Sequence, residues 1–161
     1  MNPLFEIVHD VAAPADTLRR RRYGMIEVAA GRLTSIRLRP WPKLVSLVEV
    51  MVAERWQHRR RRGDRLWLYY NQPWSSPRYL AITYALSTRD CSLASMHEAL
   101  RVLDEVARIK HIDALVCDAW NSRISDRLLR RLGWESHLPS RWHRHYIKRM
   151  KVSCPLSVVS C

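Results

Sequence analysis

Three histidines stand close together near the end of the chain and are the first candidates for metal chemistry: His137, His143 and His145. Side chains two residues apart on a strand share one face, so His143 and His145 have the spacing for bidentate metal binding. Glu135 is the only carboxylate close to them in the sequence, and it does not complete a tetrahedral set. We therefore expect imidazoles on a basic, partly exposed strand and no metal site.

Cys91 is the cysteine whose position has chemical interest. It lies just before a predicted helix, where the helix start lowers the pKa of a thiol. No base accompanies it, so it is a poor candidate for a nucleophile. The other cysteines (Cys117, Cys154 and Cys161) form no Cys-x-x-Cys pair, and Cys117 lies in an apolar run where a thiol acts as a small hydrophobe. This usage predicts reduced thiols and a cytoplasmic protein.

Arginine dominates the charge of the chain, with 24 Arg against 4 Lys and a net charge of +13. Guanidinium groups bind phosphates through paired donors, so nucleic acid, another polyanion or an anionic cofactor is one interpretation. A solvated basic surface without a target is the other, and both stay open. The stretch Trp142–Arg149 mixes cations with aromatic rings that can stack on bases. Trp142 and Tyr146 share a strand face, however, and filling the core is the favoured role for them.

Periodicity predicts the elements that position these residues. Ser92 or Ser95 is expected to cap a central helix, and Ser95 with Glu98 fits a capping box. The apolar positions expected on one face of that helix are Leu93, Met96, Leu100, Leu103, Val106 and Ala107. Helices are predicted at 43–62, 92–110 and 123–132, and strands at 4–9, 25–30, 33–38, 66–70, 78–86, 112–119 and 142–150.

The arrangement of these elements predicts one domain over residues 1–150, with 1–30 as a poorly assigned extension and 151–161 as a tail. The run Arg19–Arg22 repels itself and is expected to stay exposed. Ala30-Gly31 favours either a hairpin or two unpaired strands. A strand, a helix and a strand in that order require a parallel pair. No apolar stretch approaches membrane-spanning length, and the start does not resemble a secretory signal, so we expect no membrane partner.

Three segments carry a resemblance to a known family: Ile36–Pro40 as an opening strand, Val116–Asn121, and the helix end Leu128–Glu135 with its Leu-Gly-aromatic-Glu pattern. Together with the order of elements, they make residues 33 to 150 similar to the GNAT N-acetyltransferase superfamily. The resemblance implies an α/β fold with a mixed α+β sheet. It would have antiparallel N-terminal strands, a βαβα unit and a final strand.

The resemblance also implies acetyl-CoA as the cofactor. Acetyl-CoA would lie between the two parallel strands 79–87 and 112–119, which part at their ends. Its pyrophosphate would rest on the start of the following helix, where backbone N–H groups and the helix dipole favour anions. The residues expected to contact it are Leu86, Ser87, Arg89, Ser92 and Asn121. Asn121 has a second interpretation as a helix cap.

The chain departs from the family pattern in ways that bear on catalysis. No glycine occurs between Gly63 and Gly133, so the glycine-rich phosphate signature is absent. Leu129 stands where family members often place a tyrosine that protonates the leaving thiolate. The catalytic residues and the acyl acceptor are therefore unassigned. We expect an acetyl-CoA-dependent N-acyltransferase of the GNAT type or a descendant with a degenerate site. The alternative is a non-enzymatic basic module that binds nucleic acid.

Overall fold

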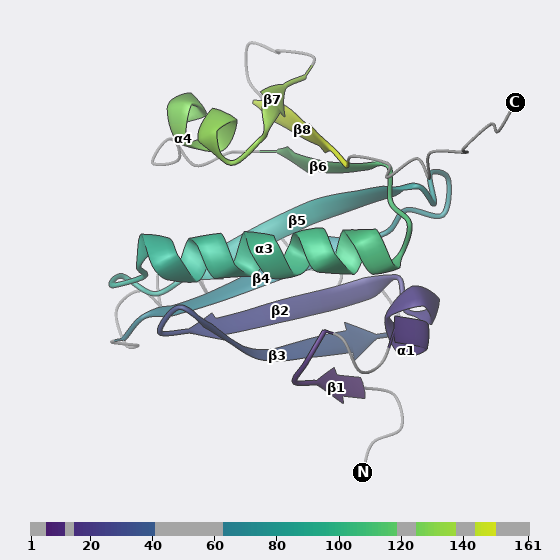
Figure 1. The fold of residues 1–161 in the computed structure, drawn as a ribbon, viewed down its shortest axis with the longest axis horizontal. Coiled ribbons are helices and arrows are strands. Elements are labelled where there is room, and N and C mark those ends of the chain that lie inside the picture. The colour runs from purple at the N-terminus through teal and green to yellow at the C-terminus, as the bar shows by residue number, and fades with distance from the viewer. Residues whose placement is uncertain (1–5, 12–14, 41–62, 119–124, 138–143, 151–161) are drawn as a thin grey trace, which may run out of the picture.

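The computed structural model describes residues 6–11, 15–40, 63–118, 125–137 and 144–150 (Figure 1). These residues form an α+β fold, in which one open, mixed and mostly antiparallel sheet of eight strands carries three helices. The predicted helix 43–62, Asn121, His143 and the predicted tail 151–161 lie outside the described residues. No helix among the described residues is both long and apolar enough to cross a membrane.

The sheet runs in the order β1-β3-β2-β4-β5-β6-β8-β7. The strands are β1 (Glu6–Val8), β2 (Tyr23–Ala29), β3 (Arg32–Arg39), β4 (Arg65–Asn71), β5 (Tyr79–Ser87), β6 (Ala114–Asp118), β7 (Glu135–Ser136) and β8 (His145–Arg149). The helices are α1 (Ala15–Arg20), α3 (Leu93–Ile109) and α4 (Asp126–Arg131). Neighbouring strands pair antiparallel except β5 and β6, which pair parallel as the strand–helix–strand order predicts.

The β2–β3 connection is a tight hairpin, which decides between the two alternatives left open by the sequence. Ala29 pairs with Arg32, and the two turn residues Ala30 and Gly31 both have positive φ, 49° and 72°. Positive φ at both central residues is the geometry whose twist matches the flanking strands. The backbone N–H of Gly31 also donates to Ser95 Oγ at 2.9 Å, so the turn is tied to α3.

Ser92 is the N-cap of α3, and its side chain accepts the Ser95 N–H at 3.1 Å. The predicted capping box of Ser95 and Glu98 is therefore wrong, and Glu98 instead pairs with Arg101 at 2.8 Å. The predicted apolar face is also partly wrong. Leu93 is 59% exposed because it begins the helix, whereas small residues face the sheet. The buried positions are Ser95, Ala99, Val102, Leu103, Val106 and Ala107.

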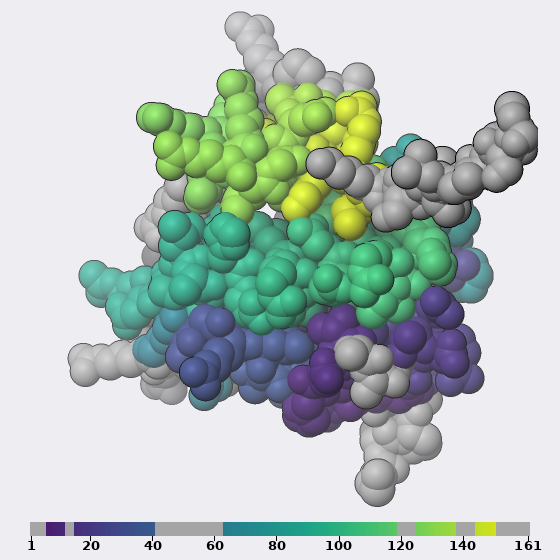
Figure 2. Space-filling view, in the orientation of Figure 1, coloured from purple at the N-terminus to yellow at the C-terminus, as the bar shows by residue number. Residues whose placement is uncertain are grey.

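One face of the sheet, which we call the α3 face, packs against α3 and holds the main core. Figure 1 shows α3 lying across this face, and Figure 2 shows it as a band between the N-terminal strands and the region of α4, β7 and β8. The strand residues of this core are almost all apolar. They include Ile26, Val28, Ile36, Leu38, Leu66, Leu68, Tyr70 and Leu80. Gly24 lets the Tyr70 ring lie close, since a Cβ there would clash with that ring.

The alternate residues of the same strands form the other side of the sheet, which we call the opposite face, because strand side chains alternate. The register places these residues in rows across neighbouring strands. They include Tyr23, Met25, Glu27, Ser35, Arg37, Arg39, Trp67, Tyr69, Asn71 and Tyr84. This face therefore combines buried apolar residues with charges and phenol groups.

Helix α1 was not predicted from the sequence, because six residues are too short to show a helical period. It is held against α3 by reciprocal contacts between the two helix ends. Lys110 Nζ donates to the carbonyl oxygens of Leu18 at 2.7 Å and Arg21 at 2.8 Å, while Arg19 Nε donates to Ile109 O at 3.0 Å. Burial and the nearby Arg22 lower the pKa of Lys110 to about 8. The arginine run is thus only partly a solvated surface.

The elements α4, β7 and β8, which we call the C-terminal unit, follow the predicted pattern with one addition. Ser125 caps α4, Leu129 is buried at 5% exposure, and Gly133 has the expected left-handed φ of 83°. The short strand β7 was not predicted, because two residues carry no alternation. It pairs with β8, where Glu135 lies opposite Ile147.

Candidate functional site

The feature that defines the candidate site is the parting of β5 and β6. Their parallel register covers four residue pairs and ends with Ile82 opposite Cys117. β5 continues to Ser87, where β4 is the one described strand registered with it. Asp118, the last described residue of β6, is registered with His145 of β8. Figure 1 shows the two strands side by side at one end and separating towards the end where α3 begins.

A β-bulge marks the point of parting. Tyr69 pairs with Tyr84 and Tyr70 with Ile82, so Thr83 is the extra residue of β5. Thr83 is exposed, and its hydroxyl donates to Tyr69 O at 3.2 Å. Bulges re-aim side chains and end pairing, and they are frequent beside active sites.

Beyond the bulge, β5 presents backbone groups away from β4. The Thr88 N–H donates to Arg65 O at 3.0 Å, which fixes the phase of the ladder. Bonded and non-bonded residues alternate in an antiparallel pair, so Leu86 and Tyr84 also bond to β4, whereas Ala85 and Ser87 direct their N–H and C=O groups to the other edge. No described strand is registered with that edge beyond Ile82. We call it the open edge of β5.

Four of the five residues expected to contact a cofactor lie at the end of the open edge. Leu86 and Ser87 are half-buried and are the last two residues of β5. Arg89 is exposed in the following loop, and Ser92 is the N-cap of α3. Among the described residues no carboxylate pairs with Arg89. The fifth, Asn121, is outside the described residues, so its assignment stays a prediction.

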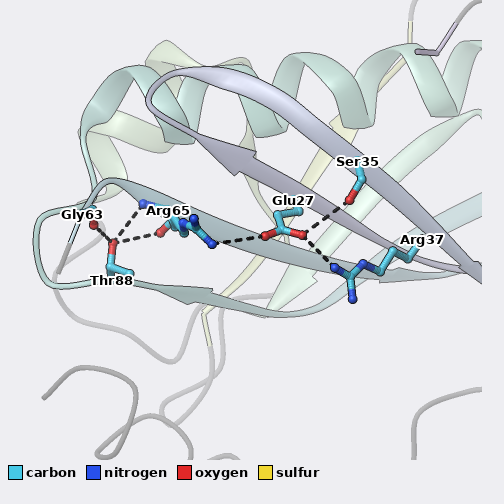
Figure 3. Close-up of polar contacts among 6 residues, drawn as sticks. All are labelled: Glu27, Ser35, Arg37, Gly63, Arg65 and Thr88. Atoms are coloured by element: carbon cyan, nitrogen blue, oxygen red, sulfur yellow. Dashed lines mark hydrogen bonds and ion pairs between the residues drawn. The ribbon is translucent and has the colours of Figure 1, made fainter. Parts of the chain in front are cut away.

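The loop between β5 and α3 is anchored by Thr88, which is 2% exposed. Its hydroxyl donates to Gly63 O, and its Oγ1 accepts the Arg65 N–H at 3.0 Å (Figure 3). The Cys91 N–H in turn donates to Thr88 O at 3.3 Å. These bonds give the glycine-free loop a fixed path.

Asp64 holds the first turn of α3. Its carboxylate accepts the Ser92 N–H at 2.8 Å and the Ser92 hydroxyl at 2.6 Å. The hydrogen bond from the Ser92 side chain lowers the pKa of Asp64, so the group is an anion at neutral pH. An internal carboxylate thus already occupies the donors of Ser92 that an external phosphate would use.

The two described cysteines are not activated. Burial raises the pKa of Cys91, and Asp64 adds to this effect through its charge and a hydrogen bond. The lowered pKa expected from the helix start is therefore wrong, because burial, followed by the nearby carboxylate, disfavours the thiolate. Burial also raises the pKa of Cys117 to about 12, in agreement with its expected role as a small hydrophobe.

Two of the aromatic and histidine candidates, Tyr146 and His145, have side-chain partners in the described part of the chain, whereas Trp142 and His143 lie outside it. Tyr146 is 3% exposed, which confirms that it fills the core, and its hydroxyl donates to Asp126. Burial raises the pKa of Tyr146. His145 Nδ1 lies 3.9 Å from an Asp118 oxygen. Among the described residues, no group of three or more His, Cys, Asp or Glu has a metal-binding arrangement.

Glu27 is a buried carboxylate that the sequence reasoning missed. It lies in the middle of β2 on the opposite face, and its side chain is 9% exposed. Arg37 Nη2 donates to it at 3.3 Å, and Arg65 Nη1 lies 4.0 Å away (Figure 3). The available signal was a single acid inside the otherwise apolar run of residues 24–29. Such a residue needs internal partners to be buried.

A small pocket of about 60 Å³ opens on the opposite face beside the bulge. It is lined by Tyr23, Gly24, Arg39, Tyr69, Tyr70, Asn71, Thr83 and Tyr84. The rings of Tyr69 and Tyr84 stack with centroids 4.1 Å apart, and the Arg39 guanidinium lies 5.5 Å from the centre of the Tyr69 ring. The sequence did not predict this pocket, because it depends on register across four strands.

Comparison with known proteins adds no assignment: no family model, no curated protein and no solved structure matches the chain. The site must therefore be interpreted from its own geometry. That geometry consists of a parted parallel pair, a bulge at the parting, an open backbone edge and a small pocket next to them, lined by tyrosines and Arg39.

Proposed function

We propose that the chain is an N-acyltransferase of the GNAT type that takes its acyl group from a pantetheine thioester such as acetyl-CoA. The observation that carries the proposal is the parting of β5 and β6 after Ile82 and Cys117, with a bulge at Thr83. A pantetheine arm is an extended chain with amide groups, so it can hydrogen-bond to the open edge as a strand does. Ala85 and Ser87 supply the matching backbone groups.

Of the two parts of acetyl-CoA, the pantetheine arm fits the site better than the phosphates do. The open edge fits the arm. The first turn of α3 does not fit the phosphates in the same way, because Asp64 occupies the N–H and hydroxyl of Ser92. Arg89 is exposed beside this contact and can pair with a phosphate from outside it. The arm therefore provides the main contacts in this proposal.

The reaction asks little of the protein beyond orientation. When bound, the thioester supplies an activated carbonyl: the acceptor nitrogen bonds to its carbon, the carbon–sulfur bond breaks, the nitrogen loses a proton to solvent, and the thiolate takes one up. The bulge at Thr83 fixes where the open edge begins and hence where the reacting end of the arm stops. Leu129 is buried and apolar, so it offers no proton to the sulfur.

The alternative of nucleic-acid binding has weaker support. Several arginines of the described surface are paired with carboxylates, among them Arg78 with Asp113 and Arg149 with Glu135, both at 2.6 Å. Paired arginines contribute less to a phosphate-binding surface. The open edge of β5 also has no role in that alternative.

The test uses two substitutions at Ala85. Ala85→Pro removes the outward N–H without removing a bond to β4, since proline is tolerated where a strand N–H faces away from its partner. We expect isothermal titration to show acetyl-CoA binding weakened by about tenfold, the effect of one lost backbone hydrogen bond together with a steric block. Ala85→Val keeps the N–H and should bind as the parent does. If the parent gives no heat and no thermal stabilisation with millimolar acetyl-CoA, the donor assignment fails.

A further inference from the structure

The pocket beside the bulge has a charge imbalance that points to an anionic ligand. Arg39 is half-buried at the end of β3, and no carboxylate among the described residues pairs with it. Its neighbours on the same face differ, since Arg37 and Arg65 share Glu27. A guanidinium partly removed from water and lacking a counter-charge favours binding of an anion.

The size of the pocket favours a small ligand group. The Tyr69 and Tyr84 rings of the lining stack face to face with an angle of 23° between their planes, so each ring holds the other in place. Gly24 contributes backbone alone to the lining. A volume of about 60 Å³ accommodates a group of a few non-hydrogen atoms.

These properties fit a carboxylate better than a phosphate. A carboxylate is planar and carries one charge, which a single guanidinium fork balances through two parallel hydrogen bonds. A phosphate is tetrahedral and carries nearly two charges, so it calls for more than one cation. Among the described residues that line the pocket, Arg39 alone is cationic.

The pocket also touches the proposed acyl-transfer site, because Thr83 and Tyr84 belong to both. The Thr83 hydroxyl gives its hydrogen to Tyr69 O, so its oxygen is left as an acceptor for an N–H group. Arg39 and Thr83 line the same pocket, so a ligand whose carboxylate binds Arg39 lies in the pocket that borders the bulge.

We propose that this pocket binds the carboxylate of the acyl acceptor and that the acceptor is a small amino acid. Carboxylate binding follows from the pocket itself, whereas the role as acceptor rests on the proposed function. The product of the reaction is then an N-acylated amino acid, which N-acetylglycine represents in its smallest form.

The experiment titrates the full chain with N-acetylglycine and, separately, with N-acetylglycinamide, which lacks the carboxylate. Backbone amide NMR signals give the position of binding. We expect saturable shifts at Tyr69, Thr83 and Tyr84 with the acid and none with the amide. Arg39→Gln should weaken binding of the acid by about tenfold or more, as expected for a lost charge-assisted pair.

Two further variants keep the test decisive. Arg32→Gln removes the same charge from the same strand away from the pocket and should leave binding unchanged. Arg39→Lys keeps the charge without the fork and should bind between the parent and Arg39→Gln, which separates loss of binding from loss of folding. Equal binding of acid and amide, binding insensitive to Arg39, or stronger binding of inorganic phosphate would overturn the carboxylate assignment.

The result also separates this inference from the proposed function. If N-acetylglycine binds and acetyl-CoA does not, the carboxylate site stands and the transferase proposal fails. If acetyl-CoA binds and N-acetylglycine does not, the transferase proposal stands and this assignment of the acceptor fails. If neither binds, both fail.

Discussion

The two faces of the sheet are built from the same strands and have opposite characters. On the α3 face, β2 and β4 contribute Ile26, Val28, Leu66 and Leu68, all of which are nearly inaccessible to water. On the opposite face, the same two strands contribute Glu27, Tyr69 and Asn71 among others. Because side chains alternate along a strand, one short sequence encodes an apolar surface and a polar one at the same time.

The comparison shows how stability and chemistry can be divided within one sheet. The α3 face has the density of apolar packing that supplies most of the free energy of folding. The opposite face holds the buried carboxylate, the stacked tyrosines and the unbalanced Arg39. Polar groups of that kind are costly to bury, so this face gives the fold less stability than the α3 face does.

The first prediction tests whether stability resides on the α3 face. Leu103→Ala removes a side chain that is 0% exposed and leaves a cavity between α3 and the sheet. We expect a loss of about 3 kcal/mol in the free energy of unfolding, measured by urea denaturation. Leu93→Ala on the same helix is the control, because Leu93 is 59% exposed and should change stability by less than about 0.5 kcal/mol. Similar losses for both variants would contradict the packing described here.

The second prediction tests the opposite face. Glu27→Gln keeps the shape of the side chain and removes the charge that Arg37 and Arg65 share. We expect a loss of about 1 kcal/mol, because both arginines are half-exposed and water compensates part of the lost attraction. Glu135→Gln, which breaks an exposed pair with Arg149, should have a smaller effect. A more stable Glu27→Gln variant would sharpen the comparison, since it would mean that folding does not require the buried carboxylate.

Periodicity was sufficient to predict the central elements of the fold. The helix at 92–110 and the parallel pair around it follow from periodicity and the order of elements, and the structure confirms them. At Ala30-Gly31 the sequence left a hairpin and two unpaired strands open, and the structure shows the hairpin. The residues of α3 that pack against the sheet were predicted less accurately. Leu103, Val106 and Ala107 are buried as predicted, but small residues such as Ser95 and Ala99 face the sheet in place of Leu93 and Met96.

The sequence located the residues of the candidate site that lie at the end of a predicted strand or the start of a predicted helix. Leu86, Ser87, Arg89 and Ser92 were located from the end of one strand and the start of one helix. Contacts between distant segments gave no local signal, so neither the carboxylate that binds Ser92 nor the pocket at Arg39 was predicted. Register across the sheet sets these contacts, and it follows from the completed fold.

The last prediction concerns the contact that joins α3 to the start of β4. The Ser92 hydrogen bonds lower the pKa of Asp64 below its ordinary value of 3.8. Because the pKa of Asp64 is lower in the folded state, the unfolded chain binds the proton more readily than the folded chain. The stabilisation by Asp64 is therefore fully present above about pH 4 and is lost as the pH falls through the folded-state pKa. The difference in unfolding free energy between the parent and Asp64→Asn should therefore shrink on acidification. The effect should be small, because Asp64 is largely solvated. As a control, Ser92→Ala should weaken the pH dependence of the unfolding free energy, because it removes the hydrogen bond that lowers the pKa of Asp64 most. A difference that stays constant down to pH values well below 3.8 would mean that Asp64 does not act on α3 through its charge.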